Sequence, residues 1–249
     1  MTHLDSAALI LAGALVATMP LFAIVARSRP VDPEVARRPA SVLLGYWVRD
    51  WFMWVIAPIE RTLVRWRVSP DLFNYLGAAF GLAAGWAYAV GELSLGAWLV
   101  LLGGASDVFD GRIARARGIA SPHGAFLDST LDRFAETFVF VGLAVLFAGR
   151  SWLVLAVCAA LGGSLLVSYT RARGESLGVQ FRGGVMQRAE RLVLLALFSL
   201  LDAATTKALG CPPRYLLVTA IVIIAIGAMG TAAYRTAMIT RELRRSADG

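Results

Sequence analysis

The chain has 249 residues, of which 58% are hydrophobic and only 16% are charged, and its mean hydropathy is +0.66. These values are typical of an integral membrane protein and argue against a soluble domain. The formal net charge is +7, and nearly all of it comes from arginine, because Lys207 is the only lysine. We therefore expect contacts with anionic lipids and anionic substrates, and no partnership with nucleic acid. Two cysteines, Cys158 and Cys211, form neither a zinc set nor a disulfide framework.

Seven segments are apolar over roughly the 20 residues that a spanning helix needs. The predicted spans are residues 7–26, 72–90, 95–113, 125–147, 152–170, 191–204 and 216–234. The sixth is short, and we expect it to extend at either end. The first lacks the positive flank of a signal peptide, since "MTHLDS" holds Asp5 and neither Lys nor Arg, so we expect a retained helix.

The arginines predict how the chain is oriented in the membrane. They cluster in residues 27–67, 112–117, 171–191 and 235–245, which fall on one side if there are seven spans. Such a bias marks the cytoplasmic side. We therefore expect a multi-pass protein of the cell membrane with its N-terminus outside. Residues 31–68 mix four tryptophans with arginines, which predicts an amphipathic helix lying in the membrane interface and broken near Pro58.

Four aspartates lie at the junction of the third and fourth predicted spans. Asp107 and Asp110 are three residues apart, and Asp128 and Asp132 are four apart, so each pair shares one face of a helix. Two antiparallel helices joined by a short turn bring both pairs to the cytoplasmic edge. Converging carboxylates repel unless cations lie between them, and oxygen ligands suit Mg²⁺ or Mn²⁺. Two such ions form a clamp for phosphoryl transfer.

The residues between the two pairs agree with an anionic ligand. Gly111 allows close approach beside Asp110, Ala114 keeps the next turn small, and Arg115 is suited to bind phosphate oxygens. The alternative is that these charges at helix ends extend to water or pair with nearby arginines. Charged residues enter spans rarely, so four at these spacings favour a functional site.

The segment 107–132, "DVFDGRIARARGIASPHGAFLDSTLD", resembles the signature of the CDP-alcohol phosphotransferases, D-x2-D-G-x2-A-R-x8-G-x3-D-x3-D, at every fixed position. The resemblance implies an all-α membrane protein with a six-helix transmembrane core, which forms homodimers. It predicts three regions: an extra N-terminal transmembrane helix (1–30), an interfacial amphipathic segment (31–68) and a catalytic domain (69–249).

The same resemblance assigns roles to the motif residues. Asp107, Asp110 and Asp128 are the expected ligands of two metal ions, and Asp132 is both a ligand and the general base that takes the proton of an acceptor hydroxyl. Asp107, Gly111, Ala114 and Arg115 are expected to line the CDP site. The acceptor alcohol then displaces CMP from a CDP-linked lipid such as CDP-diacylglycerol.

The entrance to the second predicted span resembles the family less closely. Family members have Pro-Asn followed by Leu-Thr, whereas this chain has Pro70-Asp71-Leu72-Phe73-Asn74, so the asparagine is displaced and the threonine is absent. Asn74 is the candidate nucleotide contact. The alternative is that this segment only starts a helix, with Ser69 as its N-cap.

The tract 168–193, "SYTRARGESLGVQFRGGVMQRAERLV", is similar to the corresponding region of phosphatidylinositol-phosphate synthases and their archaeal lipid counterparts. The similarity implies that Arg171, Arg173, Arg191 and, less directly, Arg235 bind the phosphate of inositol phosphate. Glycerol 3-phosphate is the main alternative acceptor, and the arginines also satisfy the positive-inside bias alone. Intramembrane prenyl transfer and cation transport are the more distant alternatives for the function.

Overall fold

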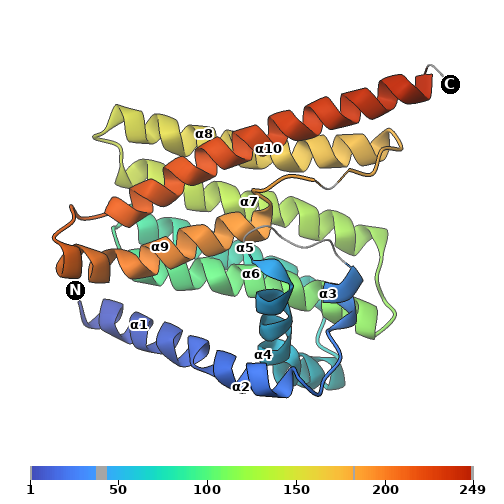
Figure 1. Cartoon of the computed structure of the whole chain (residues 1–249), viewed down its shortest axis with the longest axis horizontal. Helices are drawn as coiled ribbons and strands as arrows, with labels where there is room; N and C mark the ends of the chain where they lie inside the picture. The colour runs from blue at the N-terminus through green and yellow to red at the C-terminus, as the bar shows by residue number, and fades with distance from the viewer. Residues whose placement is uncertain (1, 38–43, 182, 248–249) are drawn as a thin grey trace.

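The computed structural model describes residues 2–37, 44–181 and 183–247, and every regular element in these ranges is a helix. Most of the helices run side by side as a bundle, with the N-terminus at one end and the C-terminus at the other, and α4 crosses the bundle direction (Figure 1). The helices are α1 (His3–Val16), α2 (Thr18–Val25), α3 (Pro33–Arg37), α4 (Gly45–Arg65), α5 (Pro70–Ala89), α6 (Leu93–Ala116), α7 (Pro122–Leu146), α8 (Ser151–Ser176), α9 (Arg188–Leu209) and α10 (Tyr215–Ala247).

Five segments of the described chain are long and apolar enough to cross a membrane: His3–Val25, Leu93–Ala116, Ser151–Ser176, Arg188–Leu209 and Tyr215–Ser246. The sixth predicted span extends at both ends, as expected, to become α9. The glycine-rich α5 and the charge-bearing α7 are not among the five, so the count of seven spans stays a prediction for these two helices.

The first predicted span is one apolar segment but two helices. The helix is interrupted at Ala17, three residues before Pro20. Proline has no backbone N–H, so Pro20 leaves the carbonyl of Val16 without its helical partner. The hydroxyl of Thr18 donates to the carbonyl of Leu15 at 2.7 Å, next to the interruption.

The predicted break near Pro58 is wrong, because α4 is continuous from Gly45 to Arg65 with this proline inside it. Pro58 removes one helical hydrogen bond, and tertiary contacts on both sides hold the helix in place. Its Trp51 Nε1 donates to Thr18 Oγ1 of α2 at 2.9 Å, and its Ile56 packs with Phe109 and Ile113 of α6. The helix therefore connects the N-terminal segment to the helix that carries the first aspartate pair.

Close backbone contact holds α5 against α7. Gly77, Gly81 and Gly85 recur every four residues along α5, a spacing that lets membrane helices approach closely. A Cβ placed on Gly85 would overlap the carbonyl of Phe138, and one on Gly142 would overlap the carbonyl of Gly85. Since α5 also packs along α6, it fixes α6 and α7 relative to each other. This three-helix contact positions the two aspartate pairs.

Candidate active site

A short turn joins the two helices that carry the aspartates. After α6 ends, Gly118 takes a left-handed backbone conformation (φ +65°), which glycine adopts without strain. Ser121 then caps α7 by accepting the backbone N–H of Gly124 at 3.1 Å, and Pro122 occupies the first helical position. The predicted helix-turn-helix is therefore confirmed, and both aspartate pairs lie near the same end of the bundle.

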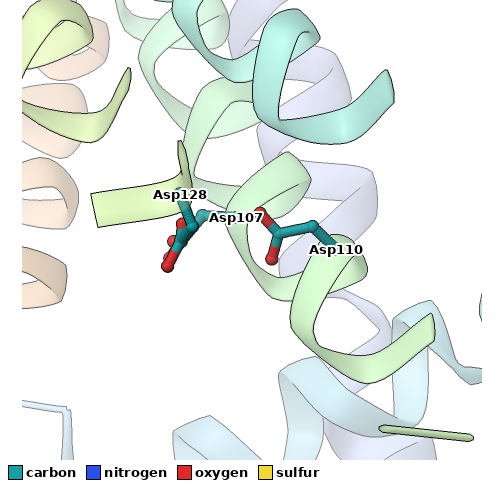
Figure 2. A group of neighbouring side chains, drawn as sticks. All are labelled: Asp107, Asp110 and Asp128. Atoms are coloured by element: carbon teal, nitrogen blue, oxygen red, sulfur yellow. The ribbon is translucent and has the colours of Figure 1, made fainter. Parts of the chain in front are cut away.

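Three of the aspartates converge as predicted. One carboxylate oxygen each from Asp107, Asp110 and Asp128 lies within 4.8 Å of the others. The carboxylates of Asp107 and Asp128 point the same way, and that of Asp110 faces them from the side (Figure 2). Asp110 is only 5% exposed, its Oδ1 accepts the N–H of Gly111, and its Oδ2 has no hydrogen-bond partner among the described residues.

A buried carboxylate oxygen without a partner is costly unless a cation compensates it. The group offers only hard oxygen donors, which is the ligand set that Mg²⁺ and Mn²⁺ prefer. These three residues therefore fit a divalent metal ion.

Asp132 lies one turn further along α7 and has a different partner. Its Oδ1 is 2.6 Å from Nη2 of Arg188, whose Nη1 is 3.0 Å from Oδ2 of Asp107. Arg133 contacts the other oxygen of Asp132 at 3.5 Å. The guanidinium of Arg188 thus joins the two aspartate pairs, and the metal role of Asp132 stays a prediction.

Arg188 was not among the site residues predicted from the sequence. It is the first residue of α9, three positions before Arg191, in a tract where arginines are expected from the positive-inside bias alone. Its position directly before an apolar run, on the helix face that carries Arg191, is the signal that would have indicated it.

On the predicted nucleotide side, the guanidinium of Arg115 lies over Gly111. A Cβ on Gly111 would be 2.8 Å from Nη1 of Arg115, so a larger residue there would make the Arg115 side chain move. Arg115 is about half exposed and forms an ion pair with Glu34 of α3. Ala114 is half-buried on the next turn. The structure therefore places Gly111, Ala114 and Arg115 together beside Asp110, as predicted.

A network of charges anchors the segment before α3 to the motif helix. Arg112 donates to Asp32 at 3.1 Å and to Glu60 of α4 at 2.6 Å. Burial raises the pKa of Asp32, but the hydrogen bonds from Arg112 and from the backbone of Glu34 outweigh it, so the pKa is lowered from its usual value. Asp32 consequently stays ionised and remains available to pair with Arg112.

Asn74 is buried on α5, and its side-chain oxygen has no hydrogen-bond partner among the described residues. The neighbouring Phe73 contacts Phe109 of α6 with ring centroids 5.5 Å apart. Asn74 therefore lies near the motif helix with an unused acceptor. The alternative role, in which this segment only starts a helix, agrees with the structure as well. The helix α5 begins at Pro70 with Ser69 as N-cap, although the Ser69 side chain makes no capping bond.

The four predicted acceptor arginines fall into two classes. Arg191 is 2% exposed and pairs with both oxygens of Glu136, one turn beyond Asp132 on α7. Arg235 is 3% exposed and donates to the backbone carbonyls of Gly183 and Val167. Arg171 and Arg173 are exposed at the end of α8. Arg171 and Arg191 are close enough to Arg235 for their charges to act on it, so these three form one group.

The family model described as CDP-alcohol phosphatidyltransferase matches residues 67–233. The chain belongs to this family. It is therefore a transferase of the kind that moves a substituted phosphate group and releases CMP, as the motif predicted. Family membership sets aside prenyl transfer and cation transport.

Among the relatives, a phosphatidylinositol phosphate synthase of Streptomyces avermitilis is 37% identical over 228 residues, covering 88% of this chain and 90% of its own. An archaetidylinositol phosphate synthase of Methanothermobacter thermautotrophicus is 40% identical over 130 residues, covering 52% of this chain and 65% of its own.

Two crystal structures of Mycobacterium tuberculosis phosphatidylinositol phosphate synthase have the same fold. One has CDP-DAG bound and the other contains manganese and citrate. Both are 30% identical with a TM-score of 0.64 and cover 73% of this chain, and this chain spans 92% and 87% of theirs. The match to the manganese complex agrees with a divalent metal at the carboxylates of Asp107, Asp110 and Asp128.

Proposed function

We propose that the protein transfers a phosphatidyl group from CDP-diacylglycerol, or a similar CDP-linked lipid, to a hydroxyl of inositol phosphate. The observation that carries the proposal is the position of Asp132. Asp132 is one turn from Asp128 on one side and one turn from Glu136, the partner of Arg191, on the other. An acceptor phosphate held by the arginines therefore puts a hydroxyl near the reacting phosphorus.

The donor binds on the α6 side of the site. Asp107, Asp110 and Asp128 would hold divalent metal, with Asp132 as a further ligand, in a centre of two ions. Metal supplies charge neutralisation of the diphosphate. Gly111 and Ala114 leave space for the CDP moiety, and Arg115 binds its phosphate oxygens in place of Glu34. Asn74 offers its unused side-chain oxygen to the nucleotide.

The transfer is a displacement at the β-phosphorus. The acceptor oxygen forms a bond to that phosphorus as its proton passes to Asp132, and the bond from the phosphorus to the bridging oxygen breaks. CMP leaves with that oxygen and its electron pair. Arg115 stabilises the charge on the leaving group, so no protonated acid is needed.

The acceptor phosphate binds to the group of Arg171, Arg191 and Arg235 together with Arg173. Arg171 and Arg173, exposed at the end of α8, make the direct contacts, and the buried Arg191 and Arg235 add charge beneath them. Phosphate alone does not distinguish inositol phosphate from glycerol 3-phosphate. The relatives named above favour the former.

Several wider features belong to the same proposal. The enzyme is a homodimer in the cell membrane, its active site faces the cytoplasm and its N-terminus is outside. Residues 1–30 are an added transmembrane helix, residues 31–68 lie in the interface, and residues 69–249 form the catalytic domain. The lipid chains of the donor enter from the bilayer between helices.

An acceptor panel tests the proposal. Purified protein is supplied with CDP-diacylglycerol, Mg²⁺ or Mn²⁺, and in turn inositol phosphate, inositol, glycerol 3-phosphate and serine, and CMP and lipid mass are measured. We expect CMP with inositol phosphate at a rate at least tenfold above the other acceptors. Turnover with glycerol 3-phosphate alone would replace the proposed acceptor and leave the reaction class intact.

A further inference from the structure

Arg188 is placed where its own helix disfavours it. It occupies the first position of α9, at the positive end of the helix dipole, where a cation is normally destabilising. Arg191 adds a second positive charge one turn later. The side chain is nevertheless held inward, with only 20% of it exposed. Something on the neighbouring helices must outweigh these costs.

The compensation comes from two carboxylates on different helices. One guanidinium nitrogen is 3.0 Å from Asp107 of α6 and another is 2.6 Å from Asp132 of α7. A guanidinium suits such bridging, because its planar fork can bind two acceptors at once. The third nitrogen, Nε, is buried without a hydrogen-bond partner among the described residues. In this part of the chain, Arg188 is therefore held by its ion pairs with Asp107 and Asp132.

Four carboxylates crowd this end of α6 and α7, and like charges so close raise the free energy of the folded state unless a cation is present. Arg188 contacts both aspartate pairs. Arg133 contacts Asp132 alone and at the longer distance of 3.5 Å, from a side chain that is 34% exposed. In the described chain, Arg188 is thus the main protein cation at the carboxylates.

We infer that Arg188 is the internal counter-ion of the metal centre: its guanidinium holds Asp107 and Asp132 together before a metal is bound, and its charge opposes metal binding. The inference rests on the metal centre of the proposed function. Two cations that share the same carboxylates repel each other, so the presence of one lowers the affinity for the other.

This arrangement has a consequence for the enzyme. The carboxylates keep their geometry without metal, and the metal affinity stays moderate. When a diphosphate binds, its oxygens offer Arg188 an alternative anion. Arg188 is therefore a positioning residue that acts through the aspartates.

The test measures metal binding and stability, without using turnover. Wild type, Arg188→Gln and the matched control Arg133→Gln are titrated with Mn²⁺ by electron paramagnetic resonance, and their Tm values are measured in EDTA and in Mn²⁺. For Arg188→Gln we expect Mn²⁺ affinity to rise about five-fold or more, Tm in EDTA to fall, and the Tm gain from Mn²⁺ to exceed that of wild type. Arg133→Gln should change the affinity less than two-fold.

Equal Mn²⁺ affinity and an equal Tm gain in wild type and Arg188→Gln would overturn the inference, as would a weaker affinity in the variant. If Arg188→Gln folds only with Mn²⁺ present, its dependence on metal supports the inference. If Arg188→Gln folds neither in EDTA nor in Mn²⁺, the same measurements are made on Arg188→Lys. Lysine keeps the charge but cannot bridge both carboxylates, so we expect Tm in EDTA to fall while the Mn²⁺ affinity rises less than five-fold. A Tm in EDTA equal to that of wild type contradicts the inference.

The wild-type titration separates this inference from the proposed function. If wild type binds no Mn²⁺, the metal centre itself is wrong. If wild type and Arg188→Gln bind Mn²⁺ equally, the metal centre stands and only the role of Arg188 is wrong.

Discussion

The carboxylates on α6 and α7 and the arginines on α8, α9 and α10 differ in how far protein contacts satisfy their charges. Asp110 keeps a buried oxygen without a partner among the described residues. Arg191, by contrast, is fully buried against Glu136, and Arg235 donates to two backbone carbonyls. Charges left uncompensated by protein are the ones available to a ligand, whereas compensated charges hold the scaffold. Mutations in the two regions should therefore fail in different ways.

The largest effect is expected for Asp110→Asn. Loss of a metal ligand should lower the rate of CMP release on the order of 10³-fold. Removing an unpartnered buried charge should also raise Tm in EDTA, because it relieves repulsion from the neighbouring aspartates. Parallel turnover and thermal unfolding measurements check both effects, with the exposed Glu242→Gln as control. If Asp110→Asn loses activity and stability together, Asp110 holds the scaffold, and the distinction between the carboxylates and the buried arginines is wrong.

Arg191→Ala should instead act first on stability. It leaves Glu136 buried and unpaired, which costs about 3–5 kcal/mol in the free energy of unfolding. The double variant Arg191→Ala with Glu136→Ala should recover part of that loss, because no lone charge remains. Unfolding in detergent measures all three proteins. If Arg191→Ala is as stable as wild type and only its acceptor KM rises, Arg191 is a ligand contact and the contrast fails.

Gly142→Ala tests whether packing positions the second aspartate pair. Its Cβ would overlap the carbonyl of Gly85, so α5 and α7 must separate, at a cost of about 1–3 kcal/mol. CMP release should fall with stability. Gly162→Ala on α8 is the control, because a Cβ there has no neighbour within 4 Å. Equal stability of the two variants would show that α5 and α7 tolerate a wider spacing.

Arg171→Ala is expected to have the smallest effect. Its side chain is exposed, and its ion pair is with Glu175, which is also exposed, so the free energy of unfolding should change by less than about 0.5 kcal/mol. Loss of a phosphate contact should raise the acceptor KM about tenfold and leave the KM for CDP-diacylglycerol unchanged. Steady-state kinetics with Arg245→Ala as control measures this. A rise in the KM for CDP-diacylglycerol would move Arg171 to the donor side.

The helix-turn-helix and the gathering of Asp107, Asp110 and Asp128 were predictable from the sequence, because helical spacing within 26 residues determines which side chains share a face. The partners of the arginines were not predictable. Arg191 and Glu136 are 55 residues apart, and their contact depends on how α7 and α9 pack. Arg188 was missed for a second reason, because arginines next to membrane spans are expected from the positive-inside bias alone.

Whether a helix breaks near a proline was also not predictable from the sequence alone. The break at Ala17 depends on a proline three residues later, and the continuity of α4 through Pro58 depends on tertiary contacts with α2 and α6. A proline in the sequence indicates where a helix loses a hydrogen bond. Whether the helix then breaks is decided by packing.

The most direct test of the account is the dependence of CMP formation on metal and on Asp132. Purified wild type and Asp132→Asn are given CDP-diacylglycerol and inositol phosphate with Mn²⁺ or with EDTA. The account predicts one CMP for each new phospholipid in wild type with Mn²⁺, and at least a roughly 10²-fold lower rate both in EDTA and for Asp132→Asn. Equal rates in wild type and Asp132→Asn, or turnover that continues in EDTA, would contradict it.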